Sequence, residues 1–507
     1  MAPGSAAPPA GDRGTEARTV VLFTLAAAAV QLTLIGNNSF TGDEQVTLLF
    51  LRADWSELWG PLWGADTHRP YYYMLLKAWS GIFGESRVAL RSLGALLHAA
   101  SLPFIWILAR RLGGRRAAVW ALAFSVLSPL AIFYGRDIRN YPLVAFSIFG
   151  SLAALSALSA LAAAERAGAS DLPARRRVLL WAGVTLGAAS AFYAHSISVL
   201  YPILVCLWAL GSAVAGLVSW RFVGQLVLAG LALALISVPA VLPMLHHAET
   251  TLKNFWIPLT TPGRLVSQMR DAYPYPAPLL PVVLGLLGLG LWRLRGSGAA
   301  GLLIPAMVIG QPVALALLGL VEPVFITRAM VWPAMLASLL LGLGLAGLPG
   351  RKLRLGAAAL VLLAQAIAAR PDYLAHYQPS EPERLAAFFD RIDPAETELI
   401  LGRQNVEHLL RWSYPALFEG PVFAFNKDDE KIVYDAANRS VRVLRAEAGK
   451  LPLTRPRFLI VQQIRPPAPP GAEVTPALDR IAARGRLIAE AKGAWWRAEL
   501  YERTGPE

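Results

Sequence analysis

The sequence VALRSLGALLHAASLPFIWILARRLGGRRAAVWALAFSVLSPLAIFYGRDIRNYPL (residues 88–143) contains two apolar runs, residues 88–108 and 117–134, on either side of a basic cluster. Each run is close to the ~20 residues that an α-helix needs to cross a bilayer. The cluster between them contains four arginines: Arg110, Arg111, Arg115 and Arg116. Such clusters are typical of cytoplasmic loops. The stretch therefore predicts two antiparallel membrane helices, with a polar segment, GRDIRNYP, at their outer end.

The composition of the whole chain fits a polytopic membrane protein. Of 507 residues, 55% are hydrophobic and 16% charged, and mean hydropathy is +0.46. Globular domains carry about 25% charged residues. Nine further runs could span a bilayer, which gives about eleven in all: residues 19–35, 142–163, 178–194, 196–218, 225–245, 279–292, 299–320, 325–345 and 355–369.

The net charge of +13 is mainly a topology signal. With the N-terminus inside, every second loop is rich in arginine, as the positive-inside rule expects. The sequence contains no nucleic-acid motif, so no nucleic-acid partner is expected, and the basic charge is compatible with binding to anionic membrane lipids. The single cysteine, Cys206, lies in an apolar run and excludes an intrachain disulfide.

The runs divide the chain into three parts. Residues 1–18 are rich in Ala, Pro and Gly and are predicted to be a disordered cytoplasmic tail, followed by a membrane domain over residues 19–370. Within it, residues 37–87 are predicted to be a first outer loop with two interfacial helices, from EQVTLLFLRADWSELWG and PYYYMLLKAWSGIFG. Counting the second of these as a span would place the later basic clusters outside.

Residues 371–507 have a different composition, with frequent charges and short β-rich runs. The runs TELILG, GPVFAFN, RSVRVLRA, RFLIVQQI and WWRAELYER predict strands, and EPERLAAFFDRI and NVEHLLRWSY predict helices. We therefore expect a small α/β domain, outside the cytoplasm by parity, without a catalytic motif of its own.

The unusual polar residues of this topology gather at the outer ends of the helices. Besides GRDIRNYP they are Asp43, Glu44, His68, Arg69, His195, His246, His247, Lys253 and Arg328. Random scatter would not favour one side, so this side is predicted to hold the functional site.

Asp43 and Glu44 follow the first span, in FTGDEQVTLL. One interpretation is helix capping, because acids are favoured in a first helical turn. The other is a catalytic base. Successive residues diverge by about 100° on a helix, so one acid can act while the other orients a neighbour.

GRDIRNYP contains Arg136, Asp137, Arg139 and Tyr141. If a helix continued through it, Asp137 and Tyr141 would share a face, although Pro142 favours a break at Tyr141. Two arginines beside an acid at an outer helix break would suit a phosphate. The alternative is a structural Arg–Asp pair with arginines that snorkel to the interface.

The histidines allow several interpretations. His68 could be a metal ligand, an acid or base, or an interface residue, whereas His195 at a span end is more often structural. His246 and His247 are adjacent and lack the i,i+4 spacing of two ligands on one helix face.

Several segments resemble the polyprenyl-phosphate-dependent GT-C glycosyltransferases, in the protein O-mannosyltransferase-like bacterial branch. They are TGDE, HRPYYYMLLKAW, the opening stretch, FWIPLTTPGRL and PVFITRAMVWPAMLASLLL. That branch includes aminoarabinose and galacturonic acid transferases that act on lipid A or core sugars. The resemblance covers most of residues 19–347, and it implies an inverting, GT-C-like enzyme of the bacterial inner membrane.

The resemblance also implies roles for individual residues. Asp43 matches the catalytic base with Glu44 beside it, and His68-Arg69-Pro70 matches the family's His-Pro-Pro-like entry to the second interfacial helix, with a basic residue as in aminoarabinose transferases. Asp137, Arg139 and Tyr141 match the family's Glu-Ala-Arg-x-Tyr, with a shorter acid, and Arg328 matches an arginine before the penultimate long span. Some relatives bind a divalent metal near the first-loop site.

The combined hypothesis is direct displacement at the outer membrane face. Arg139, with Arg69 or Arg328, would hold the phosphate of a polyprenyl (undecaprenyl) phosphate sugar, and Asp43 would deprotonate an acceptor hydroxyl on a lipid, glycan or protein. Three alternatives stay open: a lipid-linked sugar flippase or transporter, an oligosaccharide ligase or polymerase with a pyrophosphate donor, and a scaffold for envelope assembly. The nearly apolar mid-span positions and the lack of a repeat disfavour a transporter.

Overall fold

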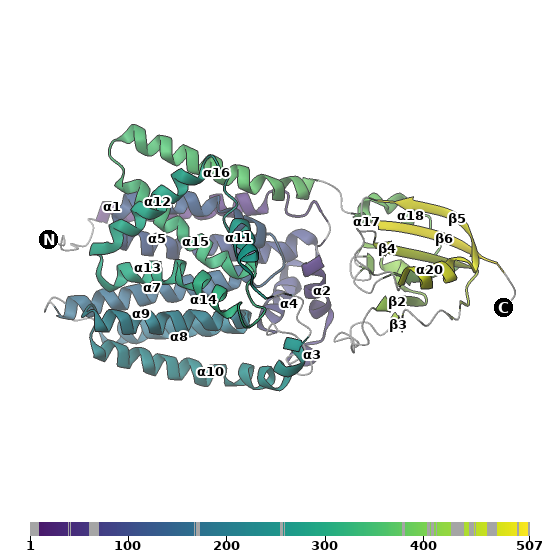
Figure 1. The fold of residues 1–507 in the computed structure, drawn as a ribbon, viewed down its shortest axis with the longest axis horizontal. Helices are drawn as coiled ribbons and strands as arrows, with labels where there is room; N and C mark the ends of the chain where they lie inside the picture. The colour runs from purple at the N-terminus through teal and green to yellow at the C-terminus, as the bar shows by residue number, and fades with distance from the viewer. Residues whose placement is uncertain are drawn as a thin grey trace. The chain divides into compact units, whose positions relative to one another are not determined.

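Long apolar helices dominate the computed structural model up to residue 377, and a β-sheet follows (Figure 1). The structure describes residues 10–38, 40, 42–59, 70–166, 168, 173–253, 257, 259–377, 381–402, 406, 410–411, 413–426, 441–445, 451, 453–463, 474–493 and 496–504. Contacts divide the chain into two units. The helical unit comprises Met1–Ile35 and Trp59–Leu374, and the sheet unit comprises Gly36–Leu58 and Ala375–Glu507.

Most helices of the helical unit correspond to the predicted runs, whereas α4 corresponds to the second predicted interfacial helix and α11 to no prediction. They are α1 (Ala10–Leu32), α4 (Tyr71–Phe83), α5 (Arg87–Val126), α6 (Pro129–Gly135), α7 (Tyr141–Arg166), α8 (Ala174–Ala194), α9 (Leu200–Val214), α10 (Trp220–Lys253), α11 (Pro262–Ala272), α12 (Leu280–Arg293), α13 (Gly298–Val308), α14 (Gly310–Leu318), α15 (Val331–Gly347) and α16 (Arg351–Tyr377). Short 3-10 turns are η2 (Ser196–Val199), η3 (Leu294–Gly296) and η4 (Thr327–Met330).

Within the described residues, nine helices are long and apolar enough to cross a membrane. This number differs from the predicted eleven at two places. The predicted run 88–108 and the first part of run 117–134 lie in the single element α5, and run 279–292 corresponds to α12, whose 14 residues are short for a span. The chain is a multi-pass membrane protein, as predicted.

Helix α5 is two helices joined at Gly114, where φ is +75°. The chain reverses direction at Gly114. A Cβ at Gly94, near the start of the first half, would lie 2.8 Å from the carbonyl oxygen of Gly135 and 3.2 Å from that of Asp137, which follow the second half. The start of the first half and the end of the second half therefore lie side by side. Glycine adopts this left-handed conformation without a steric cost. The predicted antiparallel pair is therefore present, with its turn inside the basic cluster.

Helix α15 forms the core of the helical unit, and almost all its residues are buried. It packs against α5 and α12 through glycines. A Cβ at Gly342 would lie 2.6 Å from the carbonyl oxygen of Ala117, and one at Gly344 would overlap that of Leu286. Membrane helices associate by such close approach of small residues, because lipid supplies no hydrophobic drive.

Two boundaries predicted from the sequence lie inside helices. Helix α1 begins at Ala10, within the segment predicted to be a disordered tail. Helix α16 runs through Pro371 and crosses the predicted boundary between residues 370 and 371. The division into residues 1–18, 19–370 and 371–507 stays a prediction.

The sheet unit contains a six-stranded mixed sheet in the order β3-β2-β1-β4-β6-β5. The strands are β1 (Thr397–Leu401), β2 (Val422–Asn426), β3 (Val441–Arg445), β4 (Arg457–Gln463), β5 (Gly485–Lys492) and β6 (Trp496–Arg503). Strands β1 to β4 pair in parallel, and β6 pairs antiparallel with β4 and β5. Its helices are α17 (Glu381–Arg384), α18 (Ala386–Phe389), η5 (Pro415–Phe418) and α20 (Val474–Ala482), and the first loop adds α2 (Gly42–Arg52) and α3 (Trp55–Trp59).

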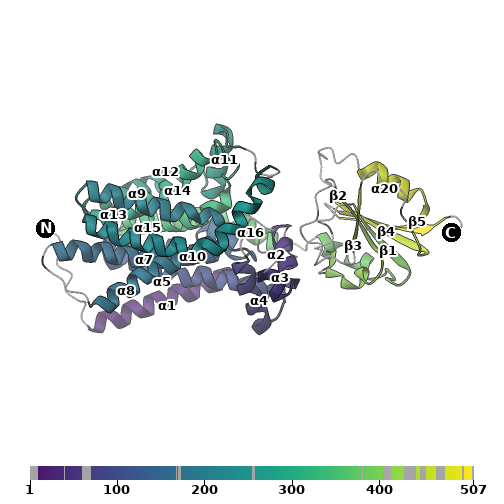
Figure 2. The ribbon, with the colours of Figure 1, turned by 90° about the horizontal axis from the view of Figure 1, so that it is seen from below.

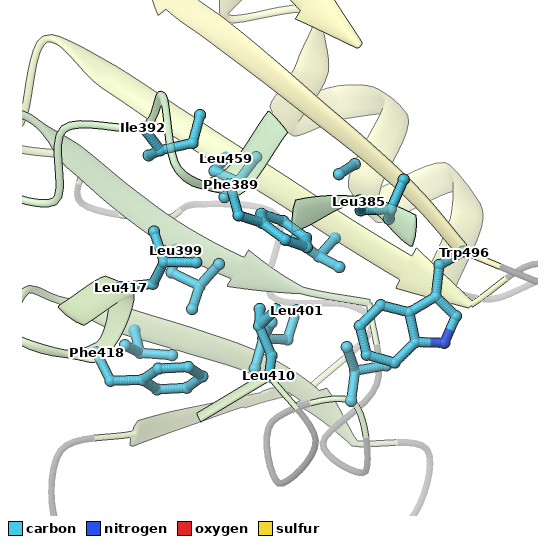
Figure 3. Close-up of a cluster of buried hydrophobic side chains, with 14 of the residues drawn as sticks. Leu385, Phe389, Ile392, Leu399, Leu401, Leu410, Leu417, Phe418, Leu459 and Trp496 are labelled. Carbon is cyan, nitrogen blue, oxygen red and sulfur yellow. The ribbon is translucent and has the colours of Figure 1, made fainter. Parts of the chain in front are cut away.

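Successive side chains of a strand point to opposite faces of the sheet. Both faces of this sheet carry buried apolar side chains that pack against other elements. Leu399, Leu401 and Leu459 pack with Phe389 of α18 on one face (Figure 3). Ile400 and the other inward residues of the opposite face pack against residues of α20, which lies beside the sheet (Figure 2). Burial on both faces explains why the central strands read as continuous apolar runs, and it confirms the predicted α/β domain.

Candidate functional site

Most of the described site residues of the helical unit lie at one end of its helices. The ring of Tyr141, at the start of α7, lies 5.8 Å from that of His195, which follows α8. Asn140 Nδ2 donates to the carbonyl oxygen of Ala194 at 2.6 Å. The ring centroid of Tyr201 lies 6.2 Å from that of Trp332. Trp332 is at the start of α15, four residues after Arg328.

The opposite end carries the basic clusters. Arg110 Nε lies 2.9 Å from Glu16 Oε1, near the start of α1. Gly113 adjoins Leu343, and Gly347 adjoins the side chain of Arg293. Because α1 and α15 each run from one end to the other, the candidate residues and the basic clusters are segregated.

The segment GRDIRNYP interrupts the helices earlier than predicted. Helix α6 ends at Gly135 and α7 begins at Tyr141, so residues 136–140 are not helical. Asp137 and Tyr141 therefore do not share a helical face, and the break expected at Tyr141 lies before it. Pro142 lies in the first turn of α7. A backbone N–H there would have no acceptor within the helix, so the lack of an N–H in proline costs no helical hydrogen bond.

Arg136 is fully buried and bound within the protein. Its Nη1 lies 3.0 Å from Asp372 Oδ2, and its Nη2 donates to the carbonyl oxygen of Thr33 at 2.7 Å. Its guanidinium carbon lies 4.3 Å from the ring centroid of Tyr373. Burial lowers the pKa of Arg136, and the charge of Asp372 acts in the opposite direction. A phosphate would have to displace Asp372, so we interpret Arg136 as structural.

Arg139, in the same break, and Tyr141, at the start of α7, are also buried. The N–H of Arg139 donates to the carbonyl oxygen of Asp137 at 2.8 Å, which forms a tight turn. The ring of Tyr141 lies between those of Tyr134, at 5.0 Å, and His195. The phosphate-binding role of Arg139 and Tyr141 stays a prediction.

His195 and Arg328 occupy short structured turns. His195 Nδ1 accepts from the N–H of Ile197 at 3.2 Å, so His195 caps η2 and its proton is on Nε2 when it is neutral. Half-buried Arg328 lies in η4, where Gln268 Oε1 accepts from the N–H and hydroxyl of Thr327 at 2.5 and 2.7 Å.

Asp43 and Glu44 lie in the first turn of α2, in the sheet unit. Asp43 is exposed and Glu44 is fully buried. This difference agrees with the predicted divergence on a helix, and of the two acids Asp43 is the one exposed at the surface.

Several predicted residues lie outside the described residues. His68 and Arg69 belong to residues 60–69, and the side chains of His246, His247 and Lys253 in α10 are not described either. Among the side chains that are described, no three His, Cys, Asp or Glu groups could hold a metal ion. The metal site stays a prediction.

Sequence reasoning missed Arg91, Asp372 and Tyr373. Arg91 is 1% exposed and its Nη1 donates to the carbonyl oxygen of Ile35 at 2.8 Å. A lone arginine inside an apolar run is a signal that could have found it. Asp372 and Tyr373 had no such signal, because their partners are remote in sequence.

No protein-family model and no curated protein matches this chain. Among solved structures, ArnT from Cupriavidus metallidurans in the apo state has a TM-score of 0.67 at 15% identity, over 96% of this chain and 99% of ArnT. ArnT from Cupriavidus metallidurans bound to undecaprenyl phosphate has a TM-score of 0.61 at 16% identity, with the same coverage of both chains. AglB, the oligosaccharyltransferase of Archaeoglobus fulgidus in complex with an inhibitory peptide and a dolichol-phosphate, gives 0.54 at 12% identity, over 90% of this chain and 70% of AglB.

These likenesses establish the fold. The predicted polytopic membrane fold with a small C-terminal domain is confirmed, and it is the fold of ArnT and AglB.

Proposed function

We propose that the chain is an inverting membrane glycosyltransferase. It transfers a sugar from a polyprenyl monophosphate, such as undecaprenyl phosphate, to a hydroxyl group of a lipid, glycan or protein acceptor. The observation that carries the proposal is the GT-C fold over 96% of the chain, with an accessible acid at position 43 and buried arginines at one end of the helices.

The proposed reaction is a single displacement. The Asp43 carboxylate takes the proton of the acceptor hydroxyl, whose oxygen attacks the anomeric carbon from the side opposite the phosphate. The bond between that carbon and the phosphate oxygen breaks, and its electron pair leaves with the lipid phosphate. Cations lower the barrier by neutralising the charge on the leaving phosphate, and a positioned base contributes about 10²–10⁴-fold.

Arg139 is the proposed main contact for the donor phosphate, with Arg69 or Arg328 as a second cation. Arg139 and Arg328 come from the same end of the helices, and guanidinium groups match phosphate geometry. Tyr141, His195, His68, Asp137 and Lys253 are further candidates around the substrates. Glu44 is proposed to orient its neighbours, because it is buried beside Asp43 in sequence.

The proposed location is the bacterial inner membrane, with the N-terminus in the cytoplasm and the domain of residues 371–507 in the periplasm. The segregation of basic clusters to one end of the helices supports this orientation. The acceptor is proposed to be a lipopolysaccharide or another envelope glycan, from the sequence resemblance to transferases that act on lipid A or core sugars.

The test is mass spectrometry of envelope glycolipids and glycans from a deletion strain, complemented at matched expression. Complementation uses the wild type, Asp43→Asn, or Asp54→Asn as control. Asp54 is an exposed acid ahead of α3, where Asn also caps a helix. We expect the mass increment of one sugar to disappear on deletion and to return with the wild type and with Asp54→Asn. With Asp43→Asn, less than about 1% of the wild-type amount of the sugar-modified product should return.

Full restoration by Asp43→Asn would mean that Asp43 is only a cap and would favour the flippase or scaffold. Release of lipid pyrophosphate rather than monophosphate by the purified protein would favour the ligase or polymerase.

A further inference from the structure

The turn that follows α1 has an unusual backbone. Leu34 has φ of +60°, and within the described residues it is the single non-glycine residue with positive φ. For a residue with a large side chain this conformation is strained. Strain of this kind persists only where surrounding groups hold it, and it is concentrated at functional sites.

Three side chains hold the carbonyl groups around this turn. The hydroxyl of Tyr373 donates to the carbonyl oxygen of Val30 at 2.7 Å. Arg136 donates to that of Thr33 at 2.7 Å, and Arg91 to that of Ile35 at 2.8 Å. The last carbonyls of a helix lack partners within it and carry partial negative charge, so two arginines are matched to this position.

Asp372 and Tyr373 hold Arg136 in turn. Asp372 pairs with the guanidinium at 3.0 Å, and the ring of Tyr373 lies below it. Both come from α16, whereas Arg136 follows α6 and Arg91 lies in α5. We call Arg91, Arg136, Asp372 and Tyr373 the exit clamp.

The exit clamp lies where the chain leaves the helical unit. Ile35 is the last residue of the first segment of that unit, and Leu374 is the last residue of its second segment. The clamp residues therefore lie at both departure points, one of which leads to Asp43 eight residues later. Arg139 is three residues from Arg136, so the same clamp also holds the segment that carries the proposed phosphate ligand.

We propose that the exit clamp positions the segment that carries Asp43. Its four members are positioning residues, which do not touch substrate, and they hold the strained turn at Leu34 from which residues 36–58 begin. This inference rests on the proposed function for the role of Asp43, but the positioning itself does not require activity.

The experiment uses the full chain in detergent or nanodiscs, with Asp372→Asn, Tyr373→Phe and Arg91→Lys as single variants. Glu16→Gln is the matched control, because Glu16 also pairs α1 with an arginine, Arg110, at the opposite end of that helix. For each protein we would measure the melting temperature, backbone hydrogen exchange over residues 36–58, and kcat and KM for the lipid-phosphate sugar.

We expect exchange over residues 36–58 to rise at least about tenfold in Asp372→Asn and Arg91→Lys, and less in Tyr373→Phe. We expect kcat to fall about 10–100-fold with the donor KM within about twofold of wild type, because misplacement by about 1 Å can cost that much. Glu16→Gln should change neither exchange nor kcat.

Unchanged exchange over residues 36–58 in Asp372→Asn and Arg91→Lys would overturn the inference, even if both variants melt earlier. A rise in donor KM without a fall in kcat would also overturn it, because it would place the arginines at the phosphate. A wild-type protein without transferase activity would contradict the proposed function instead, and the exchange measurements would still decide on the clamp.

Discussion

Leu34 shows how a single residue can be held against its own preference. At φ of +60°, a glycine avoids the steric cost of a side chain, whereas a β-branched residue increases it. We expect Leu34→Gly to melt at a higher temperature than Leu34→Val, a difference of about 1–3 kcal/mol in unfolding free energy. Thermal unfolding in detergent measures this order.

The control is Leu25, an exposed residue inside α1. There Gly costs about 1 kcal/mol of helix stability, so Leu25→Val should melt above Leu25→Gly. The same order at both positions would contradict strain at Leu34.

At the residue scale, the sequence indicated which residue types matter but not how they pair. GRDIRNYP drew attention to Arg136 and Arg139, and the carboxylate that pairs with Arg136 belongs to Asp372, which is 236 residues away along the chain. No spacing rule encodes such a distance, because spacing describes neighbours on one helix or strand. The exposure of Asp43 and burial of Glu44, in contrast, follow from helix geometry.

At the scale of elements, glycines decide how closely the membrane helices approach. A Cβ at Gly344 of α15 would overlap the carbonyl oxygen of Leu286, whereas one at Gly285 of α12 would meet nothing within 4 Å. We expect Gly344→Ala to destabilise the protein by about 1–3 kcal/mol. Gly285→Ala should be neutral or stabilising, because Ala is the better helix former.

Melting temperatures of the two variants in one detergent check this prediction. Equal effects of Gly344→Ala and Gly285→Ala would show that α12 and α15 do not pack at this glycine.

Periodicity and length predicted most elements, including five of the six strands. Strand β5 was missed because it is an edge strand with charged residues, Arg486, Glu490 and Lys492 among them, rather than a buried apolar run. Such charges protect an edge against pairing with other chains. The turn at Gly114 was predicted from its arginines, since charge marks loops more reliably than apolar length does.

At the scale of the whole molecule, the membrane topology can be tested by labelling single introduced cysteines. Cys206 is the single cysteine, so a Cys206→Ser background allows one cysteine to be placed at a time. In the proposed orientation, Glu85→Cys reacts with a membrane-impermeant maleimide in intact cells. Arg115→Cys reacts only after permeabilisation, and both positions are exposed.

The Cys206→Ser parent should stay unlabelled. The reverse pattern, with Arg115→Cys labelled in intact cells, would invert the proposed topology and place Asp43 in the cytoplasm.

The exit clamp also has a consequence for biosynthesis. Tyr373 is translated 343 residues after Val30, its partner. At about 5–20 residues per second, the ribosome reaches it roughly 20–70 s later. During that time the first helix is already inserted while its end lacks this partner and Asp372 has not yet been made. In the proposed arrangement, the exit clamp can therefore hold the segment that carries Asp43 only after α16 has been made.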